Sequence, residues 1–291
     1  MIYLLFVLLA LMSATAKMLQ KQFTNLSRNV EQAKNVYMLV VSLIAMVFFA
    51  SMAGWDLRIN GLTFVYAVLL AVLSILANLM LLKAMDYADI VTISVYASAG
   101  AIVIPFLFGV LFFKEEVSIC KIISFFLLLL IVILPLLKRE GKERMNFFGY
   151  FYSMMLFLEA GGSVMLIKFY SRAESVMNNN VLCFWANVLM LPFVLVMALK
   201  TERHSLLYSI KQLSRSTYAV AALSVVVSNA STLLSMYVVG KINLTVYTLL
   251  QNPLSLILTA LCSWLFFKEK INRQVAFNIV VSMIALLLNN I

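Results

Sequence analysis

The sequence contains few charged residues. Asp, Glu, Lys and Arg make up only 12% of its 291 residues, whereas apolar residues make up 64% and the mean hydropathy is +1.02. A soluble domain of this size carries about 25% charged residues, because its surface faces water. The composition therefore excludes an ordinary soluble domain and predicts a surface that faces lipid.

Histidine and cysteine are also scarce. The one histidine, His204, stands beside Arg203 in a polar stretch, which argues against a histidine-based zinc site or catalytic triad. The three cysteines occur singly within apolar segments, a spacing that fits neither a disulfide framework nor a metal site. The sequence has no GxxxxGK[ST] phosphate loop, so we do not expect ATP to drive its activity directly. We predict that the protein is not an enzyme and holds no cofactor and no metal.

Long apolar runs dominate the chain instead. A helix needs roughly 20 residues to cross the hydrocarbon core, and in lipid each backbone polar group must be satisfied within its own segment. These rules predict an all-α integral membrane protein with ten transmembrane helices, at 2–21, 36–54, 62–82, 90–112, 119–137, 147–168, 180–199, 218–238, 243–266 and 273–290. No basic residue precedes Lys17, so we interpret the first run as a retained span and not as a cleaved signal peptide.

One charged motif occurs twice. The sequence reads LFFKEE at Leu111–Glu116 and LFFKEK at Leu265–Lys270, and the stretches 89–115 and 243–269 align without gaps. Five predicted spans separate the motifs, and because five is odd the motifs lie on opposite sides of the membrane. This pattern predicts two five-helix repeats of inverted orientation, 1–138 and 147–291, an arrangement typical of secondary transporters. Chance similarity between two apolar helices is the alternative.

The chain resembles the drug/metabolite transporter superfamily, most closely its EamA-type permeases. In that family the fourth helix of a repeat often has a mid-helix proline, then small residues, then an acidic corner. The stretch Gln251–Glu269 fits this pattern, and Ile104–Glu115 fits a variant in which the proline is nearer the corner. The resemblance covers the whole chain. It implies ten helices around a central cavity to which both halves contribute, and it implies alternating access.

The basic residues predict an orientation. Of the 22 Lys and Arg residues, 16 lie in or beside the loops after odd-numbered spans and six after even-numbered spans. Because Lys and Arg favour cytoplasmic loops, both termini are predicted to be extracytoplasmic, although termini in the family are often cytoplasmic. We expect a multi-pass protein of the plasma membrane (a bacterial inner membrane), as a monomer or homodimer. Its expected partners are the lipid bilayer and a small-molecule substrate. We expect no nucleic-acid partner, because no soluble domain exists to present the net charge of +10.

Glu159 is the strongest candidate for a functional residue. It lies near the middle of the predicted span 147–168, 12 residues from one end and 9 from the other, so its carboxyl group cannot reach water by bending along the helix. An apolar cavity favours the protonated form of a carboxyl group, which suits a group that exchanges protons with the two sides alternately. Two roles stay open: proton coupling, or a structural carboxyl held by a hydrogen bond or by a lysine on a neighbouring helix.

Other polar side chains predict a substrate cavity. In the span 243–266, Thr248, Gln251 and Asn252 follow i, i+3 and i+4, so they share one helical face. Interhelical packing is the alternative for small polar residues, whereas a primary amide needs several partners. The whole predicted cavity set is Asn78, Thr92, Tyr96, Tyr152, Trp185, Asn187, Asn229, Tyr247, Thr248, Gln251 and Asn252.

Charged residues near span ends have two interpretations as well. Lys17 and Lys168, near the ends of the first helix of each repeat, could attract an anionic substrate or extend to the lipid head groups. Glu115 and Glu269, at the repeated corners, are expected to cap or pair locally with neighbouring lysines.

Three functions are open at this point. The first is a secondary-active transporter that moves a small metabolite or amphipathic solute by alternating access, with protons as the candidate coupling ion. The second is a flippase for lipid-linked headgroups. The third is a membrane scaffold that transports nothing, which would not need polar stripes that converge on one interior.

Overall fold

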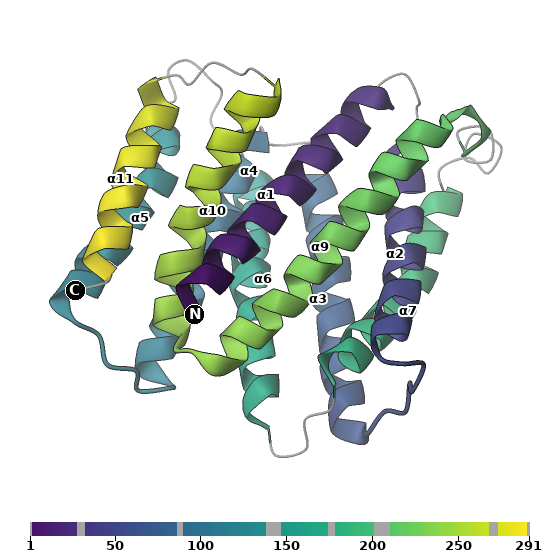
Figure 1. The fold of residues 1–291 in the computed structure, drawn as a ribbon, viewed down its shortest axis with the longest axis horizontal. Helices are drawn as coiled ribbons and strands as arrows, with labels where there is room; N and C mark the ends of the chain where they lie inside the picture. The colour runs from purple at the N-terminus through teal and green to yellow at the C-terminus, as the bar shows by residue number, and fades with distance from the viewer. Residues whose placement is uncertain are drawn as a thin grey trace. The chain divides into compact units, whose positions relative to one another are not determined.

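The computed structural model describes residues 2–27, 33–85, 90–137, 147–173, 178–200, 210–267 and 273–289. Over these ranges the chain forms helices and no strand (Figure 1). The helices are α1 (Ile2–Leu26), α2 (Ala33–Met52), α3 (Gly61–Met85), α4 (Ile90–Leu111), α5 (Ile119–Leu137), α6 (Phe147–Arg172), α7 (Asn179–Lys200), α9 (Arg215–Lys241), α10 (Leu244–Phe267) and α11 (Arg273–Asn289). Each coincides with one predicted span to within a few residues. The all-helical fold class is therefore confirmed.

Four described helical segments are long and apolar enough to cross a membrane. They are Phe147–Arg172, Asn179–Val196, Arg215–Lys241 and Leu244–Phe266. Shorter apolar helical segments of 10–17 described residues lie in the other helices: Leu4–Gln20, Val36–Met52, Gly61–Ala77, Tyr96–Leu111, Ile119–Ile131 and Ala276–Leu288. The protein thus has the character of a helical membrane protein.

Side chains at the helix ends explain where several helices begin. The Asn60 carboxamide oxygen accepts the Thr63 N–H at 2.7 Å at the start of α3, and the Ser214 hydroxyl accepts the Thr217 N–H at 3.2 Å at the start of α9. Such caps satisfy N–H groups that have no partner within the first helical turn. After α2, Gly54 adopts a φ of 65° and turns the chain.

The chain divides into two compact units. Unit 1 comprises residues 1–10, 73–172 and 236–291, and unit 2 comprises residues 11–72 and 173–235. The boundary falls within α1, α3 and α9, so each of these helices contributes to both units. The division of the sequence into repeats at 1–138 and 147–291 stays a prediction.

Unit 1 has an apolar core built by α4, α5, α10 and α11, in which α11 lies against both α5 and α10 (Figure 1). The rings of Phe106 and Phe125 stack at 4.2 Å, and Leu128 and Leu249 are fully buried. The Ser124 hydroxyl donates to the Ala285 carbonyl at 3.0 Å and links α5 to α11. Close side-chain packing and single interhelical hydrogen bonds are the forces that hold helices together in lipid.

Unit 2 contains the pair α2 and α7, together with parts of α1, α3 and α9. Its hydrogen bonds link distant parts of the chain. The hydroxyl groups of Tyr37 and Ser224 lie 3.0 Å apart, and the Tyr37 ring packs at 4.7 Å from that of Phe23. These contacts join α1, α2 and α9 within the unit.

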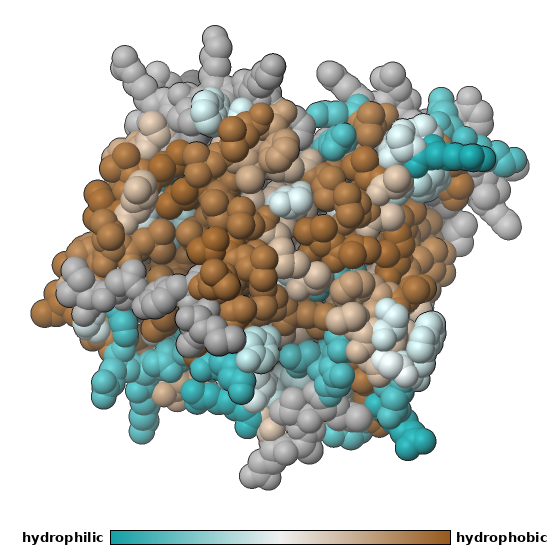
Figure 2. Space-filling view, viewed as in Figure 1, coloured by the Kyte–Doolittle hydropathy of each residue, from teal (hydrophilic) through white to brown (hydrophobic). Residues whose placement is uncertain are grey.

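The outer surface of unit 1 is apolar. Brown apolar residues cover much of the surface over α10 and α11 in Figure 2. On α11, Val280, Met283 and Leu287 are exposed, and on α5 so are Ile119 and Phe126. Exposed apolar side chains on this scale are unfavourable in water and favourable in lipid, which agrees with the membrane character of the helices.

Candidate functional site

Glu159 lies halfway along α6, and its side chain is half-buried. Within the part of the chain that the structure describes, its carboxyl group makes no hydrogen bond and no ion pair. The structural role considered for this residue needed such a partner. An intramembrane carboxyl that stabilises no contact is costly, and its cost favours a functional role.

The helix face that carries Glu159 packs against α3. Leu156, one turn before Glu159, is buried in a small cluster with Ala84, and Ala77 and Met80 of α3 pack against it. Tyr152, one turn further, joins the same cluster, and the Lys83 ammonium lies 5.6 Å from the centre of its ring. Because residues at i, i+4 and i+7 share a face, Glu159 belongs to this side of α6.

The opposite face of α6 is fixed by a close crossing with α4. A Cβ atom on Gly100 would lie 1.9 Å from the Phe157 carbonyl oxygen, and one on Gly161 would lie 2.4 Å from the Ile104 Cβ. No real side chain tolerates such distances, so the two backbones approach this closely only because both residues are glycine. Phe157 and Gly161 flank Glu159 at two residues on either side, so the crossing directs the carboxyl group away from α4.

On α10, the predicted polar stripe divides into two groups. The Thr248 hydroxyl is fully buried and donates to carbonyls of its own helix, at Leu244 (3.1 Å) and Thr245 (3.0 Å). The Asn252 amide donates to the Thr248 carbonyl at 2.9 Å. The Oε1 atom of Gln251, in contrast, is buried with no hydrogen-bond partner among the described residues. Of these three side chains, Gln251 therefore has a hydrogen-bond acceptor that is available to a ligand.

Two further members of the predicted cavity set lie in unit 1. The Tyr247 ring is buried and packs at 6.1 Å from the Phe6 ring. Tyr96 is half-buried on α4, the helix that contacts both α6 and α10. The side chains of Asn78 and Thr92 lie outside the part of the structure that is described, so their predicted place in the cavity stays a prediction.

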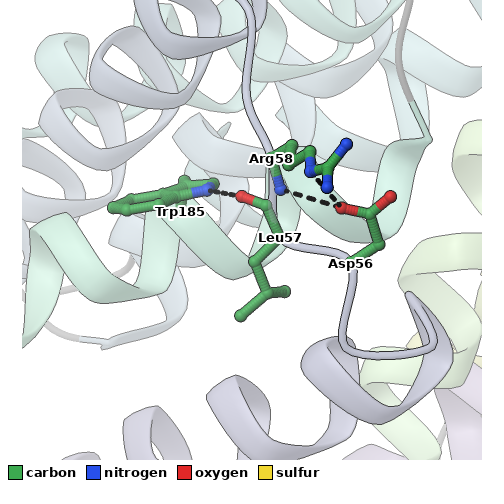
Figure 3. A network of polar contacts seen from close by, with 4 residues as sticks. All are labelled: Asp56, Leu57, Arg58 and Trp185. Carbon is green, nitrogen blue, oxygen red and sulfur yellow. Dashed lines mark hydrogen bonds and ion pairs between the residues drawn. The ribbon is translucent and has the colours of Figure 1, made fainter.

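Trp185, Asn187 and Asn229 lie in unit 2. The Trp185 indole N–H donates to the Leu57 carbonyl at 3.0 Å and attaches α7 to the connection between α2 and α3, where Asp56 and Arg58 also pair (Figure 3). The Asn187 amide donates to the Cys183 carbonyl of its own helix at 2.8 Å. The Nδ2 atom of Asn229 is buried without a partner in the described chain, and it resembles Gln251 in this respect.

The two candidate lysines differ. Lys17 is exposed on α1 in unit 2. Lys168 on α6 is 2% exposed, and its ammonium group donates to the Val239 carbonyl at 2.8 Å and to the Ile242 carbonyl. These carbonyls belong to the last turn of α9 and the residue after it, and they have no partner within the helix. Lys168 thus caps the end of α9.

Glu115 makes a contact that the sequence motif did not reveal. Its carboxylate accepts the Leu244 N–H at 2.7 Å, the Thr245 N–H at 2.9 Å and the Thr245 hydroxyl at 2.9 Å. A capping or pairing role with a neighbouring lysine was expected, but the group that it caps is the start of α10, 129 residues away. An anionic group is stabilised at a helix N-terminus by the free N–H groups and by the helix dipole.

The corner motif itself explains how Glu115 reaches α10. Lys114 adopts a left-handed backbone conformation with a φ of 50°, and the Glu115 N–H returns to the Gly109 carbonyl at 3.0 Å. This bond spans six residues, one more than the 6→1 hydrogen bond of a Schellman helix end. It reverses the chain after α4 and directs the Glu115 side chain inward, where it is 8% exposed.

No family model matches this chain. No curated protein matches it either. Solved structures do match. One of them superposes with a TM-score of 0.71 at 12% sequence identity, over 99% of this chain and 95% of its own.

That likeness extends over nearly the full length of both chains, so it concerns the fold as a whole. At 12% identity it carries the fold alone. The function therefore rests on the side chains described above.

Proposed function

We propose that this protein is a secondary-active transporter of the drug/metabolite type, which moves a small solute across the membrane by alternating access. In this proposal all ten predicted spans cross the plasma membrane, in two inverted repeats, and both termini are extracytoplasmic. The helical, apolar character of the chain and the positions of its basic residues support this arrangement.

The observation that supports the proposal most directly is the unpaired carboxyl group of Glu159. The carboxyl group lies in the middle of an apolar helix and, within the described chain, has neither a hydrogen-bond donor nor a cation beside it. A structural or scaffolding role offers no compensation for the desolvation of that group. A carboxyl that must gain and lose a proton during a cycle is instead best left free of a permanent partner.

We propose that Glu159 couples transport to protons. In apolar surroundings its neutral form is favoured, and when water reaches it from one side its ionised form is favoured. A conformational cycle that exposes the group to each side in turn therefore moves a proton. Gln251, whose Oε1 atom is buried without a hydrogen-bond partner among the described residues, is the group of unit 1 that we assign to solute binding.

Glu159→Gln tests the coupling role. The substitution keeps the size of the side chain and removes its ability to titrate. In proteoliposomes with an imposed pH gradient, we expect solute flux to fall at least tenfold, while exchange of solute without a gradient persists. Glu116→Gln is the matched control, because Glu116 is exposed on the loop after α4 and its charge should not matter. Unchanged pH-driven flux in Glu159→Gln, at normal protein level, would remove the coupling role.

A further inference from the structure

Glu115 and Lys168 act on the same short corner of the chain, the junction between α9 and α10 at residues 239–245 (Figure 1). Lys168, from α6, binds the carbonyl groups that end α9. Glu115, from the corner after α4, binds the N–H groups that begin α10. We refer to Glu115, Lys168 and residues 239–245 as the corner latch, and all of it lies in unit 1.

The latch is a specific fit. A Cβ atom on Gly109 would lie 2.7 Å from the Glu115 Oε2 atom and 2.9 Å from the Thr245 Cγ2 atom, so the carboxylate can occupy its position only beside a glycine. The charges of the latch also interact. Glu115 attracts the Lys168 ammonium group, while Arg172, one turn further along α6, repels it. Loss of Glu115 would remove this attraction and leave the repulsion between Lys168 and Arg172.

The latch is also built from groups that can separate. Its hydrogen bonds all join a side chain to a helix end or to the Thr245 hydroxyl, and Lys241 and Asn243 within the junction are exposed. At a membrane surface, water can take over helix-terminal N–H and C=O groups, whereas the same groups in the hydrocarbon core could not be released. The elements of the latch all follow even-numbered predicted spans, so the orientation proposed above assigns them to the extracytoplasmic side.

We propose that the corner latch is a gate: its bonds form when the extracytoplasmic end of unit 1 is closed, and they break when that end opens. This inference rests on the proposed function. It assigns Lys168 to the gate and not to the substrate. It also gives the first LFFKE motif a role in the gate, because the motif positions the Glu115 carboxylate that binds the start of α10.

A disulfide bridge across the latch provides the test. A Cβ atom on Gly240 would lie 3.4 Å from the Ser171 Cβ, close to the Cβ–Cβ separation of about 3.8 Å in disulfides. The double variant Ser171→Cys with Gly240→Cys therefore joins the end of α6 to the end of α9 when oxidised, and releases it when reduced. The native Cys120, Cys183 and Cys262 are replaced by alanine in this background.

The measurement is hydrogen–deuterium exchange of the Leu244 and Thr245 amides in lipid nanodiscs, because these amides donate directly to Glu115. If the latch opens as a unit, we expect exchange at least tenfold slower in the oxidised than in the reduced protein. If the latch is a static clamp, these amides exchange only by fraying of the α10 terminus, which the disulfide does not restrain. Equal rates in the two states would therefore overturn the inference.

Glu115→Gln provides a second readout in the protein with native Ser171 and Gly240. It weakens the charge-assisted bonds, so we expect the same two amides to exchange at least tenfold faster than in the wild type, and an unchanged rate would also contradict the latch. No substrate enters either experiment. If the exchange experiments show a static latch, the gate is refuted, and the transport function is still decided by the flux assays. If the latch opens but the protein moves no solute, the transport function is refuted and the opening of the latch stands.

Discussion

The glycine crossing between α4 and α6 allows a quantitative prediction, because adjacent glycines on α6 face different surroundings. A Cβ atom on Gly161 would lie 2.4 Å from the Ile104 Cβ and 2.6 Å from the Gly100 carbonyl oxygen, whereas one on Gly162 would have no atom within 4 Å. Gly161→Ala therefore forces the two helices apart by about 1 Å, since non-bonded carbon atoms pack at about 3.5–4.0 Å. Gly162→Ala requires no movement.

The expected energies follow from these distances. Overpacking costs about 1–3 kcal/mol, and a gap of roughly 0.5–1 Å removes a quarter to a half of the dispersion energy of the facing atoms. Both substitutions gain about 1 kcal/mol, because alanine favours the helix more than glycine does. We therefore expect Gly161→Ala to be less stable than Gly162→Ala by about 2–3 kcal/mol. This difference corresponds to roughly 5–10 °C in Tm.

Thermal unfolding of the purified variants in one detergent measures this difference. Gly162→Ala is expected to unfold at or slightly above the wild-type temperature. Gly100→Ala should be at least as destabilised as Gly161→Ala, because its Cβ would lie only 1.9 Å from the Phe157 carbonyl oxygen. If Gly161→Ala and Gly162→Ala unfold within 1 °C of each other, the close crossing does not exist as described.

Further predictions concern the corner and the polar stripe of α10. Lys114→Gly should raise the free energy of unfolding by about 1 kcal/mol, because glycine adopts a φ of 50° without strain. A loss of stability on thermal unfolding would contradict the left-handed backbone conformation at Lys114. Thr248→Val should leave solute flux within about twofold of wild type, since within the described chain its hydroxyl bonds to carbonyls of its own helix alone. Gln251→Leu should lower flux more than tenfold, because it removes the unpaired Oε1 atom. Equal effects of the last two substitutions would refute the division of the stripe.

The helices were predictable from the sequence because each apolar run has a composition and a length that only a helix in lipid satisfies. The predicted segment 119–137 and α5 coincide, and the predicted segment 218–238 differs from α9 only by the turns at its ends. Those turns carry Arg215 and Lys241. A span predicted from hydropathy ends before such charged residues, although the backbone hydrogen bonds of the helix continue to them.

The contacts of the site were less predictable, since they depend on which helices are neighbours. Glu159 could be identified from the sequence because it is a charged residue within an apolar run. Nothing in the sequence links Glu115 to Leu244, or Lys168 to Val239, because these partners lie 129 and 71 residues apart. The amides of Gln251 and Asn252 looked equivalent at adjacent positions, and only the three-dimensional structure separates the bonded Asn252 from the unpaired Gln251 oxygen.

Proton-driven movement of a solute is the central claim, and one measurement tests it most directly. Proteoliposomes that contain the purified protein are loaded with a mixture of small metabolites, a pH gradient is imposed, and the retained contents are quantified by mass spectrometry against protein-free liposomes. The account predicts that at least one solute is gained or lost only when the gradient is present, and that Glu159→Gln abolishes this change. If the contents of the two kinds of liposome stay the same with and without the gradient, the claim of proton-coupled transport is contradicted.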